Sequence, residues 1–214
     1  MKITTQALLF DNDGTLVSSM DSVVRCWSRW AREERVTAEA FAAVQLHGRT
    51  AVAIIRDLLP EERVPAAVRR IEELELADAD GVVVLPGTLA LLGSLPAGRW
   101  AVVTSATGRL GAARLAAAAI DPPLLISADD VTNGKPDPEP FLLAARKLGV
   151  RPEDCTVFED APAGLTAGRA AGMRTVALAT THAVEELAAD VVVRDLSAVS
   201  VQVTDAGLEI TTAG

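Results

Sequence analysis

Hydrophobic and polar positions divide the chain into stretches of different periodicity. Residues 6–10 form a short apolar run without alternation, which is typical of a strand buried on both faces. From about residue 20 to about residue 80, apolar residues recur at helical spacing and no convincing strand interrupts them. This stretch predicts four helices, over residues 19–35, 37–45, 49–59 and 65–80, with Thr37 and Pro65 as plausible helix starts.

From about residue 82 onward, strand-length apolar runs alternate with helix-length amphipathic segments. The predicted strands lie within residues 99–105, 123–131 (a strand with its exit loop), 155–160, 174–180 and 189–196. The predicted helices cover residues 108–119, 138–149, 161–173 and 183–189, and residues 201–212 predict a hairpin that turns at 205–207. Such alternation predicts an α/β fold, with a Rossmann-like parallel sheet and helices on both of its faces.

The helical stretch separates the first strand from all later ones, so an α/β core is interrupted by an insertion. We predict a core formed by residues 1–17 and 85–214 and an all-helical cap formed by residues 18–84. In open parallel sheets, ligands bind at the carboxyl ends of the strands, near the switch in strand order. The residues at these strand ends are therefore the candidates for a functional site.

Composition and charge narrow the possible partners. The chain has 214 residues and a net charge of −9, and such an acidic chain binds nucleic acids and anionic membranes poorly. Cys26 and Cys155 lack the spacing of a zinc site or a disulfide framework. No apolar stretch approaches the length of a membrane span, and the N-terminus lacks the features of a signal peptide. We expect a cytoplasmic monomer without nucleic-acid or membrane partners.

Polar side chains follow four of the predicted strands. Asp11 and Asp13 follow the first, Thr104, Ser105 and Ala106 the second, Lys135 the third, and Glu159 and Asp160 the fourth. Carboxylates that crowd together need a cation, and oxygen ligands without His or Cys suit Mg²⁺. Lys135 adds an ammonium, and Thr104 with nearby backbone N–H groups before a helix forms an anion cradle. Together these groups describe a phosphate site in which a carboxylate can act as nucleophile.

The strings "FDNDGT", "VVTSAT", "GKPDPEPF" and "VFEDAPAG" occur along the chain over residues 6 to about 180. In their order and spacing the sequence resembles the haloacid dehalogenase (HAD) superfamily. The resemblance is closest to the sugar-phosphate and glycerol-3-phosphate phosphatases that carry a helical cap after the first strand. It implies a HAD-like core and a Mg²⁺-dependent phosphatase that acts on a small phosphorylated metabolite through an aspartyl-phosphate intermediate.

The resemblance also implies catalytic roles. Asp11 is then the nucleophile, and Asp13 protonates the leaving alkoxide before it takes a proton from the water that attacks the intermediate. Lys135 neutralises charge on the nucleophile and on the phosphate. The family often has a cis peptide at the step that is Lys135–Pro136 here.

Phosphate and metal ligands follow from the same resemblance. The phosphoryl group is held by the Thr104 side chain and by the backbone N–H groups of Ser105 and Ala106. The implied Mg²⁺ ligands are Asp11, Asp13 through its backbone carbonyl, and Asp160, with Glu159 ligating directly or through water.

The string "HGRT" begins one of the predicted cap helices. By resemblance it points at the leaving group of the substrate, so His47 and Arg49 are candidates to contact a hydroxyl or a second anionic group. Both residues fit a solvated helix start equally well. Hinges near residues 16–18 and 81–87 would let the cap open for substrate and close to exclude water.

Two other functions stay open. A β-phosphoglucomutase-like mutase shares these motifs, although such relatives usually carry a His on the first cap helix and residues 22–24 contain none. A receiver-type phospho-acceptor also uses an Asp pair, Mg²⁺ and a Lys, but it lacks a large helical insertion and stays phosphorylated. Release of free phosphate over many turnovers favours hydrolysis over both.

Overall fold

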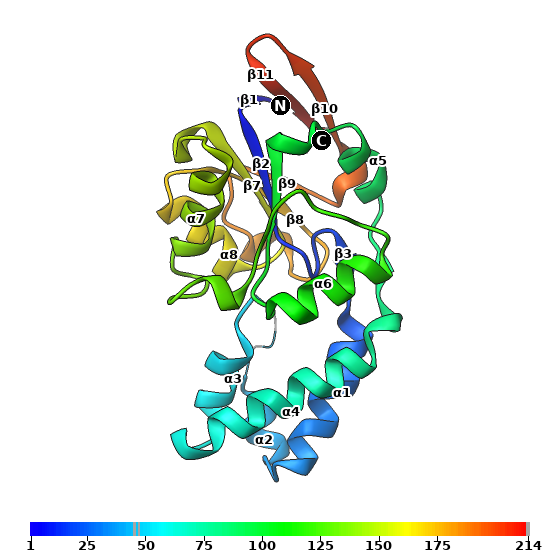
Figure 1. Cartoon of the computed structure of the whole chain (residues 1–214), viewed down its shortest axis with the longest axis vertical. Coiled ribbons are helices and arrows are strands. Elements are labelled where there is room, and N and C mark those ends of the chain that lie inside the picture. Colours follow the sequence, from blue (N-terminus) through cyan, green and yellow to red (C-terminus); the bar gives the residue numbers. More distant parts are fainter. Residues whose placement is uncertain (45, 47, 213–214) are drawn as a thin grey trace.

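A parallel sheet forms the centre of the computed structural model, which describes residues 1–44, 46 and 48–212 (Figure 1). Its six strands lie in the order β6-β5-β2-β7-β8-β9, and each pair of neighbours runs parallel. The strands are β2 (Ala7–Phe10), β5 (Trp100–Val103), β6 (Leu125–Ile126), β7 (Cys155–Glu159), β8 (Arg174–Leu178) and β9 (Val191–Val193). The predicted α/β class is confirmed, and the strand order reverses beside β2.

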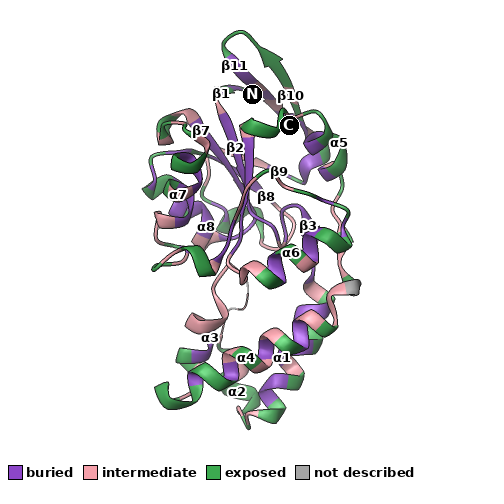
Figure 2. Cartoon of the chain, in the orientation of Figure 1, coloured by how far each residue is buried: buried purple, intermediate pink, exposed green. Residues whose placement is uncertain are grey.

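Alternate side chains of the strands build a core on each face of the sheet. Figure 2 shows the central strands in the colour of buried residues. Leu8 and Phe10 face α5 (Thr88–Gly93) and α6 (Gly108–Ala117), whose Leu91 and Leu115 belong to the same cluster. On the opposite face, α7 (Glu139–Leu148) and α8 (Pro162–Ala170) pack against Ala7 and Leu9. Because both faces are covered, the short central strands contain almost only apolar residues.

Four of the helices described between β2 and β5 form a separate helical segment, residues 20–77. They are α1 (Met20–Glu33), α2 (Ala38–Ala42), α3 (Ala51–Leu58) and α4 (Val64–Ala77). The segment has its own apolar core, in which Trp30 is fully buried and donates its indole N–H to Ala67 O at 3.0 Å. The four predicted helices are confirmed, and Thr37 caps α2 by accepting from Ala40 N.

The inserted stretch is not all-helical, because a two-stranded ribbon lies where the chain enters and leaves the helical segment. It pairs β3 (Val17–Ser18) with β4 (Val83–Val84) in antiparallel fashion. Leu16 O extends this contact by accepting from Leu85 N at 3.0 Å and from Thr88 Oγ1 at 2.9 Å. Strands of two residues are too short to produce a sequence pattern. The domain boundaries at residues 17–18 and 84–85 remain a prediction.

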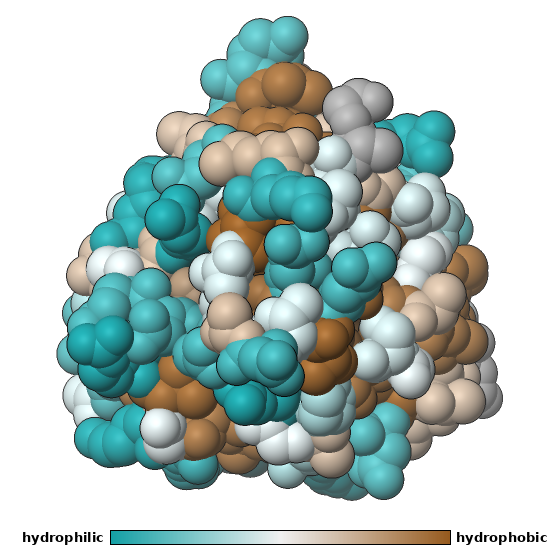
Figure 3. Space-filling view, turned by 90° about the horizontal axis from the view of Figure 1, so that it is seen from above, coloured by the Kyte–Doolittle hydropathy of each residue, from teal (hydrophilic) through white to brown (hydrophobic). Residues whose placement is uncertain are grey.

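A second, antiparallel sheet covers the end of the molecule away from the helical segment. It has the order β1-β11-β10, with β1 (Lys2–Thr5), β10 (Val199–Thr204) and β11 (Gly207–Thr212). The predicted hairpin is confirmed, whereas β1 was not predicted, because its four residues contain a single apolar one, Ile3, and show no period. Figure 3 looks onto this end, where hydrophilic and hydrophobic surface areas are interspersed.

One predicted helix is wrong. Residues 183–189 form only the 3₁₀ turn Val184–Glu186, because Leu187 is buried and Ala188 O accepts from Arg169 instead of continuing a helix. The other 3₁₀ turns are Glu61–Arg63, Ala79–Gly81, Ala97–Arg99, Ala128–Asp130, Pro152–Asp154 and Leu196–Ala198. In the part of the chain that the structure describes, no helix is long and apolar enough to cross a bilayer.

Candidate active site

The turn after β2 places Asp11 beside the carboxyl end of β7. Asp11 N donates to Phe158 O at 2.9 Å, which continues the pairing of the two strands. Gly14 then adopts a φ of +95°, and a Cβ at this position would lie 2.2 Å from Asp160 Oδ2. Glycine is therefore required both by the left-handed backbone and by the close approach of Asp160.

Lys135 joins three strand ends. Its Nζ donates to Asp11 Oδ1 at 2.6 Å, to Glu159 Oε1 at 2.8 Å and to Val103 O at 2.8 Å. The side chain is only 1% exposed, so these three acceptors satisfy all the donors of a buried ammonium. The Lys135–Pro136 peptide is cis, as expected.

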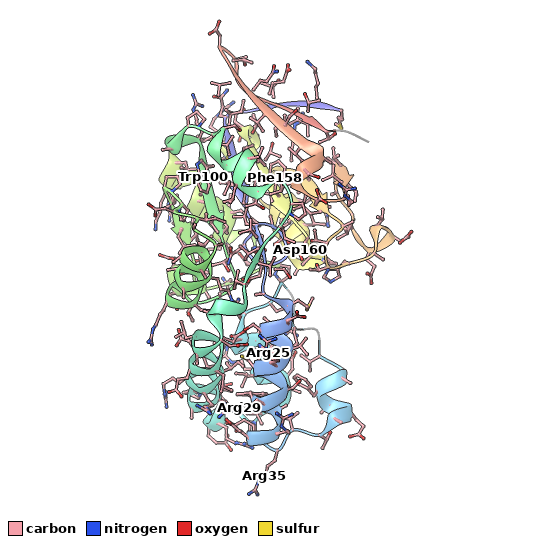
Figure 4. The ribbon with its side chains drawn as sticks, turned by 90° about the vertical axis from the view of Figure 1, so that its right-hand side faces the viewer. Arg25, Arg29, Arg35, Trp100, Phe158 and Asp160 are labelled. Atoms are coloured by element: carbon pink, nitrogen blue, oxygen red, sulfur yellow. The ribbon has the colours of Figure 1, made fainter. Side chains whose placement is uncertain are left out.

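Three buried carboxylates, Asp11, Glu159 and Asp160, can hold a metal ion. Each offers an oxygen, and these oxygens lie within 4.8 Å of one another. Lys135 offsets part of their charge, and the remaining negative charge together with an oxygen-only ligand set fits a hard divalent cation. Figure 4 shows Asp160 at the end of the sheet that faces the helical segment, while Trp100 and Phe158 lie deeper in the core.

The ionisation of this cluster is controlled by burial. Burial raises the pKa of Asp11 to about 7, and the neighbouring Glu159 adds to the rise while Lys135 opposes it. Burial likewise raises the pKa of Asp160 well above its usual value, with Glu159 and Asp11 contributing. Burial lowers the pKa of Lys135, but Asp11 and Glu159 outweigh it, so the net pKa is raised and the ammonium stays charged. Lys135 therefore offsets only part of the negative charge of the carboxylates, and a bound cation would offset the rest.

Neighbouring groups fix the orientation of Glu159 and Asp160. Glu159 Oε2 accepts from the backbone N–H groups of Asp160 at 2.9 Å and Ala161 at 2.8 Å. Asp160 accepts from the hydroxyl of Thr181 and, at 3.4 Å, from that of Thr15. Thr181 was missed by the sequence analysis, although it comes shortly after β8, at the same edge of the sheet as Asp160.

Asp13 faces away from Lys135 and toward the helical segment. Its Oδ1 accepts from Ser19 Oγ at 2.6 Å, and its Oδ2 accepts from Arg114 Nη1 at 3.0 Å. Arg114, on α6, also donates to Oε1 of Glu75, on α4, at 2.9 Å. The carboxylate of Asp13 is thus held by groups near the cap rather than by the acidic cluster.

Arg114 was also missed by the sequence analysis. It follows Leu110 by four residues and therefore lies on the buried face of α6, where an arginine requires a partner. An arginine at an apolar position of a predicted helix was the sequence signal that could have identified this residue. Burial raises the pKa of its partner Glu75 from the usual value, and the charge of Arg114 opposes the rise.

The loop between β5 and α6 carries the predicted phosphate-binding residues. Thr104 is buried, and its Oγ1 accepts from Ala106 N at 3.1 Å. The Ser105 hydroxyl donates to Gly48 O, in the inserted stretch, at 3.4 Å. Thr107 caps α6 by accepting from Leu110 N, so the loop lies at the N-terminus of this helix, where anions are favoured.

A cavity of about 220 Å³ lies between the strand ends and the helical segment. Asp11 and Thr104 contribute to its lining from the sheet side, and Trp27 and Ile71 contribute apolar surface from the helices. Arg49 also lines it and is paired with Asp57. The other predicted cap residue, His47, lies outside the described residues. The cavity is therefore adjacent to the acidic cluster and combines polar with apolar walls, as ligand sites commonly do.

Comparison with known proteins identifies the family. The model of the haloacid dehalogenase-like hydrolases matches residues 5–172, so the chain belongs to this family. It is 40% identical over 179 residues to hexitol phosphatase A of Escherichia coli K12, covering 81% of this chain and 82% of that protein. It is 30% identical over 216 residues to glycerol-1-phosphate phosphohydrolase 2 of Saccharomyces cerevisiae, covering 94% and 86%.

The fold is also similar to that of a solved structure. A hydrolase from Pseudomonas syringae superposes with a TM-score of 0.83 at 26% identity, covering 90% of this chain and 94% of that one. The predicted superfamily and its fold are thus confirmed.

Proposed function

We propose that the protein is a Mg²⁺-dependent phosphatase that hydrolyses a small sugar or polyol phosphate. The observation that carries this proposal is the buried cluster of Asp11, Glu159 and Asp160, with Lys135 among them, beside a cavity of about 220 Å³. Family membership and the names of the two relatives, a hexitol phosphatase and a glycerol-1-phosphate phosphohydrolase, support it.

In the first half-reaction, a carboxylate oxygen of Asp11 forms a bond to phosphorus. The bond from phosphorus to the ester oxygen breaks, and its electron pair stays on the leaving oxygen. Asp13 gives this oxygen a proton, so the products are a free alcohol and an aspartyl phosphate. Lys135 offsets negative charge on Asp11, and Thr104 with the N–H groups of Ser105 and Ala106 holds the phosphoryl oxygens.

In the second half-reaction, water attacks phosphorus and the bond to the Asp11 oxygen breaks. The carboxylate of Asp13 takes a proton from the attacking water, which returns both aspartates to their starting forms. The contacts of Asp13 with Ser19 and Arg114 keep its carboxyl group directed toward the cavity side of the site.

Mg²⁺ would be held by Asp11, by the backbone carbonyl of Asp13 and by Asp160. Glu159 already accepts from Lys135 and from two backbone N–H groups, which favours an indirect contact through water. When bound, the ion supplies positive charge that stabilises the developing charge on the phosphoryl oxygens.

Residues 18–84 act in this proposal as a cap over the cavity. Their contacts with the core, such as Ser105 Oγ to Gly48 O and Thr107 Oγ1 to Glu72 Oε1 at 2.6 Å, describe a closed arrangement. The ribbon of β3 and β4 is the place where the chain would bend. Closure excludes water from the aspartyl phosphate until the leaving alcohol has departed.

The test is phosphate release from a panel of polyol, sugar, glycolate and nucleotide phosphates, with Mg²⁺ and with EDTA. We expect turnover of polyol or sugar phosphates that EDTA abolishes. Asp11→Asn should lower turnover by about 10⁴-fold or more, because it removes the nucleophile. An exposed matched change, Asp121→Asn, should have no effect. Normal turnover by Asp11→Asn would overturn the proposal.

The same assay separates the two alternatives. A mutase would convert a sugar 1-phosphate into an isomeric sugar phosphate without release of free phosphate. A receiver-type protein would accept one phosphoryl group and then stop. Continued phosphate release contradicts both.

A further inference from the structure

Carboxylates outnumber cations on the described wall of the cavity. The lining contains the carboxylates of Asp11, Asp13, Glu72, Glu75 and Asp129, and the guanidinium groups of Arg49 and Arg114. Asp11 belongs to the metal cluster, and the other carboxylates surround the remainder of the cavity. The charge and pairing of these groups determine which leaving groups the cavity accepts.

Arg114 is already neutralised by two carboxylates. Its side chain is 6% exposed, and it donates one N–H to Asp13 at 3.0 Å and another to Glu75 at 2.9 Å. These contacts do not use every N–H of the guanidinium, but they offset its charge, so a second anionic group on a substrate would gain little net attraction from it. Displacing Glu75, whose side chain is 7% exposed, would leave a buried carboxylate without its partner, which is strongly unfavourable.

Arg49 is also paired, although its ion pair is more exposed, with 29% of the Arg49 side chain and 51% of the Asp57 side chain accessible. Its Nη1 lies 2.8 Å from Asp57 Oδ2, and its Nη2 donates to Ala53 O at 3.3 Å. Neither arginine of the described lining is therefore without a partner. A substrate with a second anionic group would meet paired cations and additional carboxylates.

Hydroxyl groups, by contrast, match this wall. Each can donate to a carboxylate such as Glu72 or Asp129 and accept from a guanidinium, while a second carboxylate or phosphate only accepts. The apolar surfaces of Trp27, Val52 and Ile71 face the same cavity and suit the C–H bonds of a carbon chain. The lining thus fits an uncharged polyhydroxyl group better than a charged one.

We propose that the wall formed by Glu72, Glu75 and Arg114 selects phosphate esters whose leaving group is an uncharged polyhydroxyl compound. Esters that carry a second anionic group are rejected by the paired arginine and by the carboxylates. This inference rests on the proposed phosphatase function and specifies the substrate class of the same site.

Matched substrates that differ only in one charge test the selectivity. Glycerol 3-phosphate and 3-phosphoglycerate form one pair, and sorbitol 6-phosphate and 6-phosphogluconate form another, with a primary alcohol replaced by a carboxylate in each. We expect kcat/KM to favour the alcohol by about 100-fold or more for whichever pair the protein hydrolyses. A ratio below about threefold would overturn the inference. Absence of phosphate release from every ester would instead reject the proposed function.

One variant tests whether the residues of the wall determine the selectivity. Glu75→Gln keeps the size of the side chain and removes its charge, so Arg114 gains net positive charge. We expect the kcat/KM ratio of alcohol to carboxylate substrate to fall by about tenfold or more. Because the readout is a ratio, a general loss of active protein cancels. An unchanged ratio would show that Glu75 does not determine the selectivity between the two substrates.

Two further variants complete the test. Glu73 lies on the same helix as Glu75 but faces Arg70 outside the cavity, and the Glu73 side chain is 63% exposed. The control Glu73→Gln should therefore leave the ratio unchanged. Glu72→Gln lowers the negative charge of the wall without touching the Arg114 pair and should shift the ratio in the same direction as Glu75→Gln. If Glu75→Gln does not fold, Glu72→Gln decides the question, and an unchanged ratio there contradicts the proposal.

Discussion

Asp11 and Asp13 have different surroundings although one residue separates them. Asp11 is buried against Lys135, whereas the side chain of Asp13 is 20% exposed and contacts Ser19 and Arg114. Two carboxylates in different environments can take different roles, one as nucleophile and one as proton donor and acceptor. In a continuing strand two residues at this spacing would share one face, so it is the turn after β2 that gives the two carboxylates different surroundings.

At the residue scale, Asp13→Asn separates the two half-reactions. The amide cannot take a proton from water, so hydrolysis of the aspartyl phosphate should slow by about 10²- to 10⁴-fold. With acetyl phosphate as donor, whose leaving group needs no protonation, we expect the phosphorylated protein to accumulate. Intact-protein mass spectrometry detects the adduct, and Asp121→Asn serves as the unaffected control. Normal turnover without an adduct would contradict the assigned role.

The sequence predicted which residues meet at the strand ends but not the residues that support them. Asp11, Lys135 and Glu159 each follow a recognisable strand, so the parallel sheet itself brings them together. Arg114 and Glu75 contact each other across two helices that no local pattern relates. Such long-range pairs depend on how the helical segment packs against the core. The spacing of residues along one sequence does not show which helices pack together.

At the element scale, α8 is packed against the acidic cluster through Gly164. A Cβ at this position would lie 1.7 Å from Glu159 Oε1, the atom that accepts from Lys135. Gly164→Ala should therefore displace Glu159, lower the free energy of unfolding by about 1–3 kcal/mol and reduce kcat, although alanine is the better helix former. Urea denaturation and steady-state kinetics measure both effects.

Gly93→Ala is the matched control for this prediction. Gly93 is also helical, but a Cβ there would meet nothing within 4 Å, so the change should be neutral or stabilise by up to about 1 kcal/mol. If Gly164→Ala matched Gly93→Ala in stability and activity, the close packing of α8 on Glu159 would not be required.

The success of the element predictions depended largely on length. The long helices α1 and α4 and the four- and five-residue strands of the parallel sheet carry several apolar positions each and were recognised. The short α2 and β6 were recognised from the cap residue Thr37 and from the apolar run of residues 123–126. The short α5 (Thr88–Gly93), β3 and β4 offer too few positions for a period to appear. The segment 183–189 has helical composition, but the burial of Leu187 and the contact of Arg169 with Ala188 O override it.

At the scale of the whole molecule, the sheet supplies the acidic cluster and the helical segment supplies much of the cavity wall. Glu72 and Glu75, one helical turn apart on α4, contact Thr107 and Arg114 of the core. In the proposed function, catalysis is therefore carried by the core, and substrate selection depends on residues of both parts, which meet at one cavity. The monomeric state and cytoplasmic location stay predictions.

The pH dependence of stability should reveal the cation site. The pKa of Asp11 is raised to about 7, and that of Asp160 is raised well above the usual value, mainly by burial. The folded state therefore binds these protons more tightly than the unfolded chain. This contribution to stability is full below about pH 4 and is lost as the pH rises toward 7. Mg²⁺ binds the deprotonated carboxylates, so its stabilising effect must increase over the same range.

We accordingly expect saturating Mg²⁺ to raise Tm only slightly at pH 5 and by several degrees at pH 8, since a cation at 100 times its Kd contributes about 2.7 kcal/mol. Differential scanning fluorimetry at a series of pH values, with Mg²⁺ or with EDTA, measures the difference. Asp160→Asn removes one proposed ligand and should reduce the shift at pH 8, whereas Asp121→Asn should not. A shift that is equal at pH 5 and pH 8 would mean that the cation does not bind at these carboxylates, because only there must it displace tightly held protons.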